Sequence, residues 1–486
     1  MSSPFDEQRY KSLLEGLEAS EVMLSELELD NEKFRFDNEF FMKKYINAYR
    51  TIKSCKYTTI TDIMECLTDF HANGSYEIIA KNFKLLDTTD YAYMVRTTDL
   101  EADDFESNVK YVSKNTYEFL AKSKIFGGEL LINKIGTPGK TYLMPDLKKH
   151  VSLGMNLFMI RLKPNCEIRE TYLWLFLNTE IGQNIIKRKI NGTVPLTIDK
   201  EAIKSLYVPV PTLDFQNKIE KIVKLAYSKR KQSKILYRQA EELLLETIGL
   251  KDFQLTQENK SIKSFSESFL ATGRLDAEYY QPKYEEIISK IQERQYEKLG
   301  NLVTIQKSIE PGSDAYSDEG LPFIRVSDYN KFGVSTPDKY LSDNFCREND
   351  ELLKSLYPKK ETILFSKNGS VVTAYMLHEN MQAVTSGAIL HLAVKDKSKV
   401  LPEYLTLALN SEVVKQQSER DAGGSIILHW RISEIENVVV PIVDYGIQQQ
   451  ISELIEKSFY LCGESKRLLE EAKDMVEKEI EKRMTV

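Results

Sequence analysis

One loop of the sequence contains residue types that bind phosphate. It reads GTPGKT and includes Gly136, Thr137, Gly139 and Lys140. Glycines let backbone N–H groups approach an anion closely, and a lysine adds a positive charge. A nucleotide-binding P-loop also needs a glycine five residues before Gly139, where this chain has Lys134. The loop, with Lys134 at its start, is therefore predicted either to contact nucleic-acid phosphates or to be a plain hairpin turn.

A second candidate lies where a predicted helix ends in basic residues before a glycine turn. Its side chains can donate hydrogen bonds to DNA: Lys187, Arg188, Lys189, Asn191 and Thr193. Lysine and arginine near a helix C-terminus also stabilise the helix by themselves, so a solvated helix end is the alternative.

The second half of the chain has counterparts of both candidates. The loop KNGSVV supplies Lys367, Asn368 and Ser370. The run SERDAGGSIILHWR supplies Arg420, Ser425, His429, Trp430 and Arg431. An arginine beside Trp and His suits contact with base edges or stacking on bases, and the alternative for Trp430 is a place in the core.

No group of residues forms a recognisable catalytic or metal-binding pattern. The five histidines lack the spacing of metal ligands, and the five cysteines include no CxxC pair. The stretch PDLKK begins like a nuclease motif, but no acidic-x-Lys partner follows it, and no methyltransferase motif occurs. We therefore expect a chain that is not an enzyme, with no catalytic residues, no metal and no cofactor.

Charge is distributed unevenly along the chain. The formal net charge of -7 argues against nucleic acid as a partner if it is considered alone. Residues 181–238, however, contain 13 basic and 4 acidic side chains, so a local basic face is compatible with the acidic average. No apolar run approaches the roughly 18 residues of a membrane helix, and the first residues lack an export leader, so we expect a cytoplasmic protein.

The chain repeats itself at half its length. FRFDNEFFMKKY at residues 34–45 resembles GRLDAEYYQPKY at residues 273–284. YLWLFLNTEI at 172–181 matches YLTLALNSEV at 404–413, and the same offset places Gln216 on Gln448. The matched pieces occur in the same order in both halves, which indicates a tandem duplication.

Each copy is predicted to be a mixed globular unit followed by a long helix. Short β-branched runs bounded by Gly and Pro indicate strands. Apolar stripes with helical spacing follow Gln216 and Gln448, the first ending at Gly249. We predict an α+β fold with two tandem target-recognition lobes joined by two long antiparallel coiled-coil helices, with pseudo-two-fold symmetry. The expected boundaries are an N-terminal helical arm at 1–50, lobe 1 at 51–214, spacer helix 1 at 215–250, a linker and second entry arm at 251–296, lobe 2 at 297–446, and spacer helix 2 at 447–486.

In this ordered set of motifs, present twice, the chain resembles specificity subunits of type I restriction–modification systems. The resemblance implies that each lobe reads one half of a bipartite double-stranded DNA target and that the helices form a spacer. It also implies that DNA adenine methyltransferase subunits and restriction motor-nuclease subunits are partners and perform the chemistry.

Three alternatives stay open at this point. The same module could serve another phage-defence or combined methyltransferase–nuclease system, which neighbouring genes would reveal. A self-contained nuclease is disfavoured by the incomplete acidic pattern, and a metal-dependent cleavage assay tests it. A protein scaffold with two degenerate lobes would not bind DNA. The half-site sequences, the gap length and the partner stoichiometry are not readable from the sequence.

Overall fold

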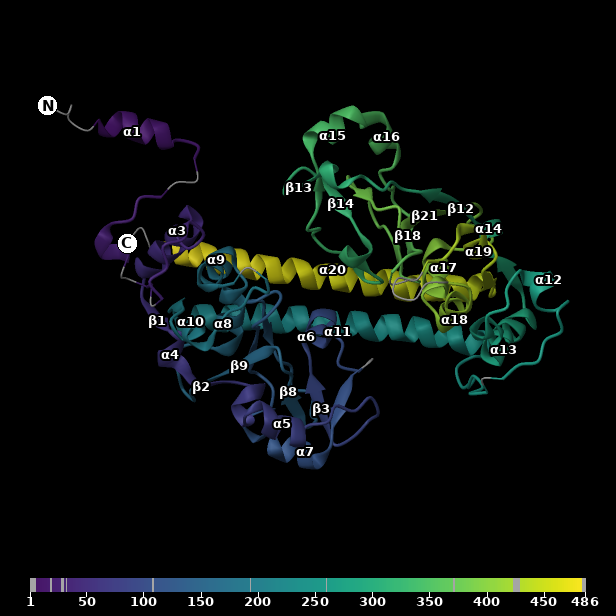
Figure 1. The fold of residues 1–486 in the computed structure, drawn as a ribbon, viewed down its shortest axis with the longest axis horizontal. Helices are drawn as coiled ribbons and strands as arrows, with labels where there is room; N and C mark the ends of the chain where they lie inside the picture. The colour runs from purple at the N-terminus through teal and green to yellow at the C-terminus, as the bar shows by residue number, and fades with distance from the viewer. Residues whose placement is uncertain are drawn as a thin grey trace. The chain divides into compact units, whose positions relative to one another are not determined.

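The computed structural model describes the chain except for residues 1–5, 18–19, 28–29, 32, 107–108, 193, 259, 370–371, 423–428 and 483–486. Two compact units account for the rest. Unit 1 comprises residues 1–228 and 465–486, and unit 2 comprises residues 229–464. Each unit contains one lobe of the repeat together with one part of each long helix (Figure 1).

Unit 1 contains two four-stranded sheets. The first has the order β2-β9-β6-β7, with β2 at Met64–Asp69, β9 at Leu157–Leu162, β6 at Leu130–Asn133 and β7 at Thr141–Leu143. The second has the order β4-β3-β8-β5, with β4 at Lys110–Val112, β3 at Ala92–Val95, β8 at Val151–Leu153 and β5 at Lys124–Ile125. Every residue of β3 and β6 is buried, which explains why these strands are apolar without alternation.

Helices and one short strand pair complete unit 1. The pair is antiparallel and joins β1, Tyr57–Thr59, to β10, Tyr207–Pro209. The helices are α1 at Glu7–Leu14, α2 at Leu24–Leu27, α3 at Lys43–Lys53, α4 at Ile60–Ile63, α5 at Tyr76–Asn82, α6 at Thr97–Ala102, α7 at Lys114–Phe119, α8 at Glu170–Leu177, α9 at Glu180–Lys189 and α10 at Lys200–Lys204. The main core of the unit lies between the first sheet and α3, α8 and α9.

Unit 2 repeats this plan. Its first sheet has the order β12-β21-β18-β19, with β12 at Val303–Lys307, β21 at Ile389–Val394, β18 at Ile363–Ser366 and β19 at Ala374–Met376. Its second sheet has the order β13-β17-β14-β20, with β13 at Tyr316–Ser317, β17 at Tyr340–Leu341, β14 at Leu321–Ile324 and β20 at Val384–Thr385. As in unit 1, one pair of strands in the second sheet is parallel, β14 with β20 here and β3 with β8 there.

Some of the remaining elements of unit 2 correspond to those of unit 1, and others do not. β11, Tyr296–Lys298, pairs with β22, Val439–Pro441, as β1 pairs with β10. A small two-stranded pair, β15 at Tyr329–Asn330 and β16 at Gly333–Val334, is also present. The helices are α12 at Phe269–Thr272, α13 at Pro282–Gln292, α14 at Leu299–Leu302, α15 at Asp343–Glu348, α16 at Asp350–Ser355, α17 at Pro402–Leu409, α18 at Glu412–Asp421 and α19 at Ile432–Ile435.

The repeated sequence motifs have structural roles that are the same in both units. The buried Gln216 side chain accepts a hydrogen bond from the Arg169 N–H at 2.8 Å, which satisfies a free amide at the start of α8. Gln448 does the same for the Leu401 N–H at the start of α17, at 3.0 Å. The repeat of the glutamine therefore preserves a hydrogen bond that holds a long helix to its lobe.

The two long helices are α11, Leu213–Thr247, and α20, Tyr445–Lys482. In unit 1, Ile219 and Val223 of α11 share a core with Ala472, Val476 and Ile480 of α20. In unit 2, Lys229 lies 3.8 Å from Glu464, and the Ser233 hydroxyl lies 3.0 Å from that of Ser458. Residue numbers rise along one helix as they fall along the other, so the helices are antiparallel within unit 2.

The end of α11 matches the stop signal in the sequence. Gly249 has a φ of +74°, and the Leu250 N–H donates to the Leu245 carbonyl at 2.8 Å, which is the Schellman arrangement. The structure thus confirms an α+β fold with two repeated lobes and two long helices. None of the helices described combines the length and apolar character required to cross a membrane.

Candidate nucleic-acid interface

The glycine loop of unit 1 is a tight connection between β6 and β7. The Asn133 N–H donates to the Lys140 carbonyl at 2.9 Å, and the Gly139 N–H donates to the Asn133 carbonyl at 2.8 Å. Gly139 has a φ of +86°, and a Cβ there would lie 2.2 Å from Cγ2 of Ile186 in α9, so glycine is required for packing. Gly136 has a φ of +87° but faces open space. The loop is thus a hairpin turn whose exposed part, at Gly136 and Thr137, is accessible to a ligand.

The basic run at the end of α9 divides into one exposed and two buried side chains. Lys187 is exposed and has no ion-pair partner among the described residues. The Arg188 guanidinium lies 4.2 Å from the Phe40 ring centre and 4.5 Å from that of Tyr49, and its Nε donates to the Phe40 carbonyl. The Lys189 Nζ donates to the Asp30 carbonyl at 3.0 Å. Burial and these contacts support structural roles for Arg188 and Lys189 rather than DNA contact.

Candidates that are far apart in the sequence meet in one groove of unit 1. The groove has a volume of about 1310 Å³, and its lining includes Gly136, Thr137, Lys140, Lys187 and Asn191. The segment around residues 35–45, which begins the first repeat, forms the remaining wall. Sequence reasoning named these loop and helix-end residues separately, and it did not foresee that the entry segment completes their groove.

Lys134, the other candidate of this loop, is buried outside that groove. Its Nζ lies 3.0 Å from the Asp69 carboxylate, which also accepts from the Lys200 Nζ at 2.7 Å. Burial raises the pKa of Asp69, but the hydrogen bonds from Lys200 and Lys134 lower it further, so the pKa lies below its ordinary value. Lys134 is therefore neutralised within the protein, and its surroundings favour a structural role.

An arginine of the entry segment closes one end of the groove. Arg35 makes two hydrogen bonds of 2.7 Å to Asp37, and it also donates to the Ile190 carbonyl at 2.7 Å and to the Asn191 side chain at 3.1 Å. The bidentate pair lowers the pKa of Asp37. Arg35 thus ties the entry segment to the turn after α9, and Asn191 is partly engaged by this contact.

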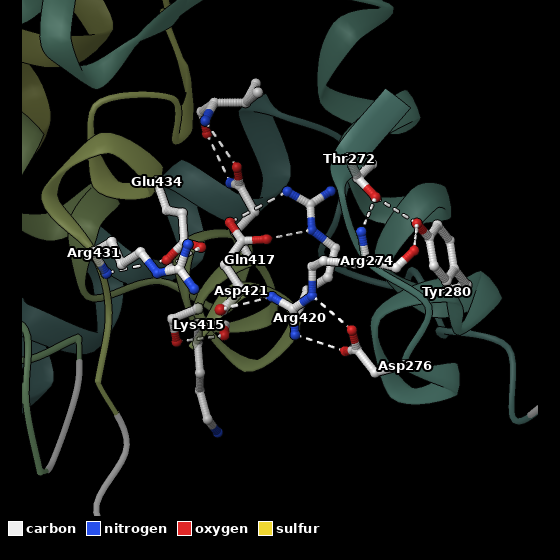
Figure 2. A network of polar contacts seen from close by, with 12 residues as sticks. Thr272, Arg274, Asp276, Tyr280, Lys415, Gln417, Arg420, Asp421, Arg431 and Glu434 are labelled. Carbon is white, nitrogen blue, oxygen red and sulfur yellow. Dashed lines mark hydrogen bonds and ion pairs between the residues drawn. The ribbon is translucent and has the colours of Figure 1, made fainter. Parts of the chain in front are cut away.

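Unit 2 contains the same arrangement at the corresponding positions (Figure 2). Arg274 makes hydrogen bonds of 2.9 and 2.6 Å to Asp276, and its Nη1 donates to the Asp421 carbonyl at 3.0 Å. Arg420 pairs with Asp421 at 2.7 Å and lies 5.1 Å from the Tyr279 ring centre, as Arg188 lies over Phe40. Because this arginine contact recurs in both lobes, it supports a structural role for Arg420 also.

The other candidates of unit 2 differ in exposure. Trp430 is 1% exposed, packs 6.0 Å from the Phe365 ring and donates its backbone N–H to the Lys367 carbonyl, so it is a core residue. His429 and Arg431 on either side of it are exposed. Asn368 forms a backbone bridge with His429. Lys367 is half-buried, and burial together with the charge of Lys307 lowers the pKa of its ammonium group.

Two further observations complete the account of the predicted positions. Thr193, Ser370 and Ser425 lie outside the described residues. The pairs Arg96–Asp99 and Arg325–Asp328, which occur at the same place in both copies of the repeat, are ion pairs with buried carboxylates, which supports a structural role for them. The DNA-binding assignment of the exposed residues remains a prediction.

The chain is similar to specificity subunits of type I restriction systems. The specificity subunit of the type I restriction enzyme MjaIX from Methanocaldococcus jannaschii is 22% identical over 311 residues, which are 61% of this chain and 64% of that relative. The match thus spans a little under two thirds of the relative's length.

Two solved structures also align with the chain. The S subunit of a type I restriction–modification system from M. genitalium has 13% identity and a TM-score of 0.38, and covers 88% of this chain and 95% of its own. The HsdS subunit from Thermoanaerobacter tengcongensis has 12% identity, a TM-score of 0.27 and the same coverage. The model of the type I restriction modification DNA specificity domain matches residues 55–236 and 292–472, which is more than half of the chain. The chain therefore belongs to the family of type I restriction modification DNA specificity domains.

Proposed function

We propose that this chain is the DNA-specificity subunit of a type I restriction–modification complex and that it reads a bipartite double-stranded target, one half with each lobe. The observation that supports this most is that the specificity-domain model matches the chain twice and that the first sheet of each unit has the same strand arrangement. Two readers in one chain suit a target with two half-sites, as two-fold dimers suit paired half-sites.

In this proposal the groove of unit 1 contributes contacts with the first half-site. Lys187 supplies a positive charge that has no ion-pair partner among the described residues, and the exposed Gly136 and Thr137 supply backbone amides and a hydroxyl. Lys140 is exposed but lies 3.0 Å from Glu101, so it must exchange that partner for a phosphate. Phosphate contacts of this kind set the register of the protein, while specificity requires contacts with base edges.

The partners in the proposal are DNA adenine methyltransferase subunits and motor-nuclease subunits, which perform methylation and ATP-dependent cleavage. The chain itself has a recognition role. Its partners would also contribute to phosphate neutralisation, because the chain has a net charge of -7.

The experiment is methylome sequencing of a host that carries the chain with its methyltransferase. We expect one adenine-methylated motif with two defined halves and an undefined gap. Replacement of Lys187 by Ala should weaken binding of that motif and reduce the salt slope of log K by about 0.9, since one phosphate contact is lost. The matched control is Lys81→Ala, which removes the same charge from an exposed position of α5 that does not line the groove. A continuous motif, or no motif, would contradict the proposal.

A further inference from the structure

In unit 1 the charges at one end of the first sheet are balanced within the protein. Asp69 ends β2, and Asp69 and Ile132 both lie opposite Phe158 of the central strand β9. Lys134 follows β6 at the same end and forms the buried ion pair with Asp69. The side chains of Lys134 and Asp69 are each 10% exposed. A buried lysine is stable in this place because a carboxylate faces it.

In unit 2 the strand register places a lysine where unit 1 has the aspartate. Lys307 ends β12 and lies opposite Leu390, the central-strand residue that is also opposite Phe365. Leu390 has the same position in β21 as Phe158 in β9, so Lys307 corresponds to Asp69. The other lysine is retained, because Lys367 follows β18 as Lys134 follows β6.

This end of the unit 2 sheet therefore has two cations, and neither forms an ion pair with a residue that the structure describes. Among the described residues, no carboxylate lies within 4.0 Å of the Lys367 Nζ, whose nearest hydrogen-bond acceptor is the Asn368 side chain at 3.5 Å. Burial and then Lys307 lower the pKa of Lys367, while Glu310 has a smaller effect in the opposite direction. The same backbone site in unit 1 shows that the fold can accommodate an aspartate, so the charge in unit 2 is not imposed by the fold.

We propose that Lys307 and Lys367 together bind a phosphate of the DNA backbone, an inference that rests on the proposed function. Lys307 is exposed and Lys367 is half-buried, so an anion can reach both. Gly369 follows in a left-handed conformation with open space around the place of a Cβ, and Asn368 is bridged to the exposed His429, so the backbone next to Lys367 is open to a ligand. Lobe 1 has no such contact at this position, because Asp69 already occupies the anion's place.

The repeat itself provides the decisive variant. Lys307→Asp restores in unit 2 the lysine–aspartate pair of unit 1, so the variant should keep or raise the melting temperature while DNA binding weakens. The measurement uses the full chain with its methyltransferase subunits and duplex DNA carrying the methylated motif, with affinity determined across a range of salt concentrations. The double variant Lys307→Gln/Lys367→Gln should reduce the salt slope by about 0.9, since one phosphate contact is lost, and each single variant should reduce it by part of that amount.

The possible results separate this inference from the proposed function. If Lys307→Asp and the double Gln variant bind the duplex with wild-type affinity and slope, while Lys187→Ala still lowers the slope, the phosphate site is refuted and DNA recognition stands. If the wild-type complex fails to bind the duplex at all, the proposed function is refuted, and this site with it. A Glu310→Gln variant should bind slightly more tightly, since it removes the one opposing charge named above.

Discussion

Asp69→Asn should destabilise unit 1 strongly, because it leaves two lysines without their shared anion. The side chains of Asp69 and Lys134 are buried, so water cannot replace the lost carboxylate. Removing one partner of a buried ion pair typically costs about 3–5 kcal/mol. The side-chain oxygen of the new asparagine can still accept one hydrogen bond. We therefore expect the free energy of unfolding to fall by about 3 kcal/mol, the lower end of that range.

The chain offers a direct way to follow unit 1 alone. It has two tryptophans, Trp174 in unit 1 and Trp430 in unit 2. The Trp430 Nε1 has no hydrogen-bond partner among the described residues, so Trp430→Phe removes no hydrogen bond and leaves Trp174 as the reporter. Urea unfolding of Asp69→Asn in this background, followed by tryptophan fluorescence, gives the loss in the free energy of unfolding.

A matched control and a pH series sharpen the test. Asp87→Asn breaks the exposed pair with Lys110 and should leave the free energy of unfolding nearly unchanged, because exposed ion pairs contribute little. The folded-state pKa of Asp69 is below its ordinary value of 3.8, so its contribution is complete above about pH 4 and is lost as pH falls through the folded pKa. The difference between wild type and Asp69→Asn should therefore be constant from pH 7 to pH 5 and shrink below pH 4. Equal costs for the Asp69 and Asp87 variants would refute the reasoning.

Two further predictions concern unit 2 and the long helices. Burial lowers the pKa of His391 to about 4, and its ring lies 2.8 Å from the Thr385 hydroxyl. The free energy of unfolding of unit 2 should therefore fall by up to about 3 kcal/mol as pH falls from 6.5 to 4. Trp430 fluorescence in a Trp174→Phe background should show that His391→Gln removes this pH dependence. Inserting seven residues after Ser228 and seven after Glu464 keeps the apolar stripes of both helices in phase and adds about 10 Å to each. On the proposed function, methylome sequencing should then show unchanged half-sites and a gap longer by about three base pairs, whereas altered half-sites with the original gap would contradict the spacer role.

The repeated scaffold could be predicted from the sequence because periodic and local sequence patterns determine it. The helical stripes, the Gly249 stop and the positions of Gln216 and Gln448 all depend on neighbours that are close in the chain or recur at a fixed offset. The structural role of Arg188 could have been predicted from the same offset, because Arg188 corresponds to Arg420. A residue type that both lobes share at one position favours a role in the scaffold.

The groove and the exchange of Asp69 for Lys307 could not be predicted in this way. The groove combines segments near residues 35, 136 and 187, and its shape depends on tertiary packing alone. The correspondence of Asp69 with Lys307 is hidden because β2 contains a register shift between Met64 and Cys66, which moves the offset between the copies by one residue. Only the strand pairing shows which residues occupy the same place.

The comparison of the two lobes separates residues that hold the fold from residues that can distinguish DNA sequences. The arginine–carboxylate contacts of the entry segments recur in both units with the same geometry, so they cannot make the lobes read differently. The exposed cations do not recur. Lys187 of lobe 1 is replaced in lobe 2 by Glu419, which lies 3.6 Å from Lys283. The neutralised sheet end of lobe 1 corresponds in lobe 2 to Lys307 and Lys367, which form no ion pair with any residue that the structure describes. Two lobes with one backbone plan thus present positive charge from different places. On the proposed function, these charges would set the position of each lobe on the DNA backbone, so the two lobes can dock differently on their half-sites, while contacts with base edges would specify the sequences.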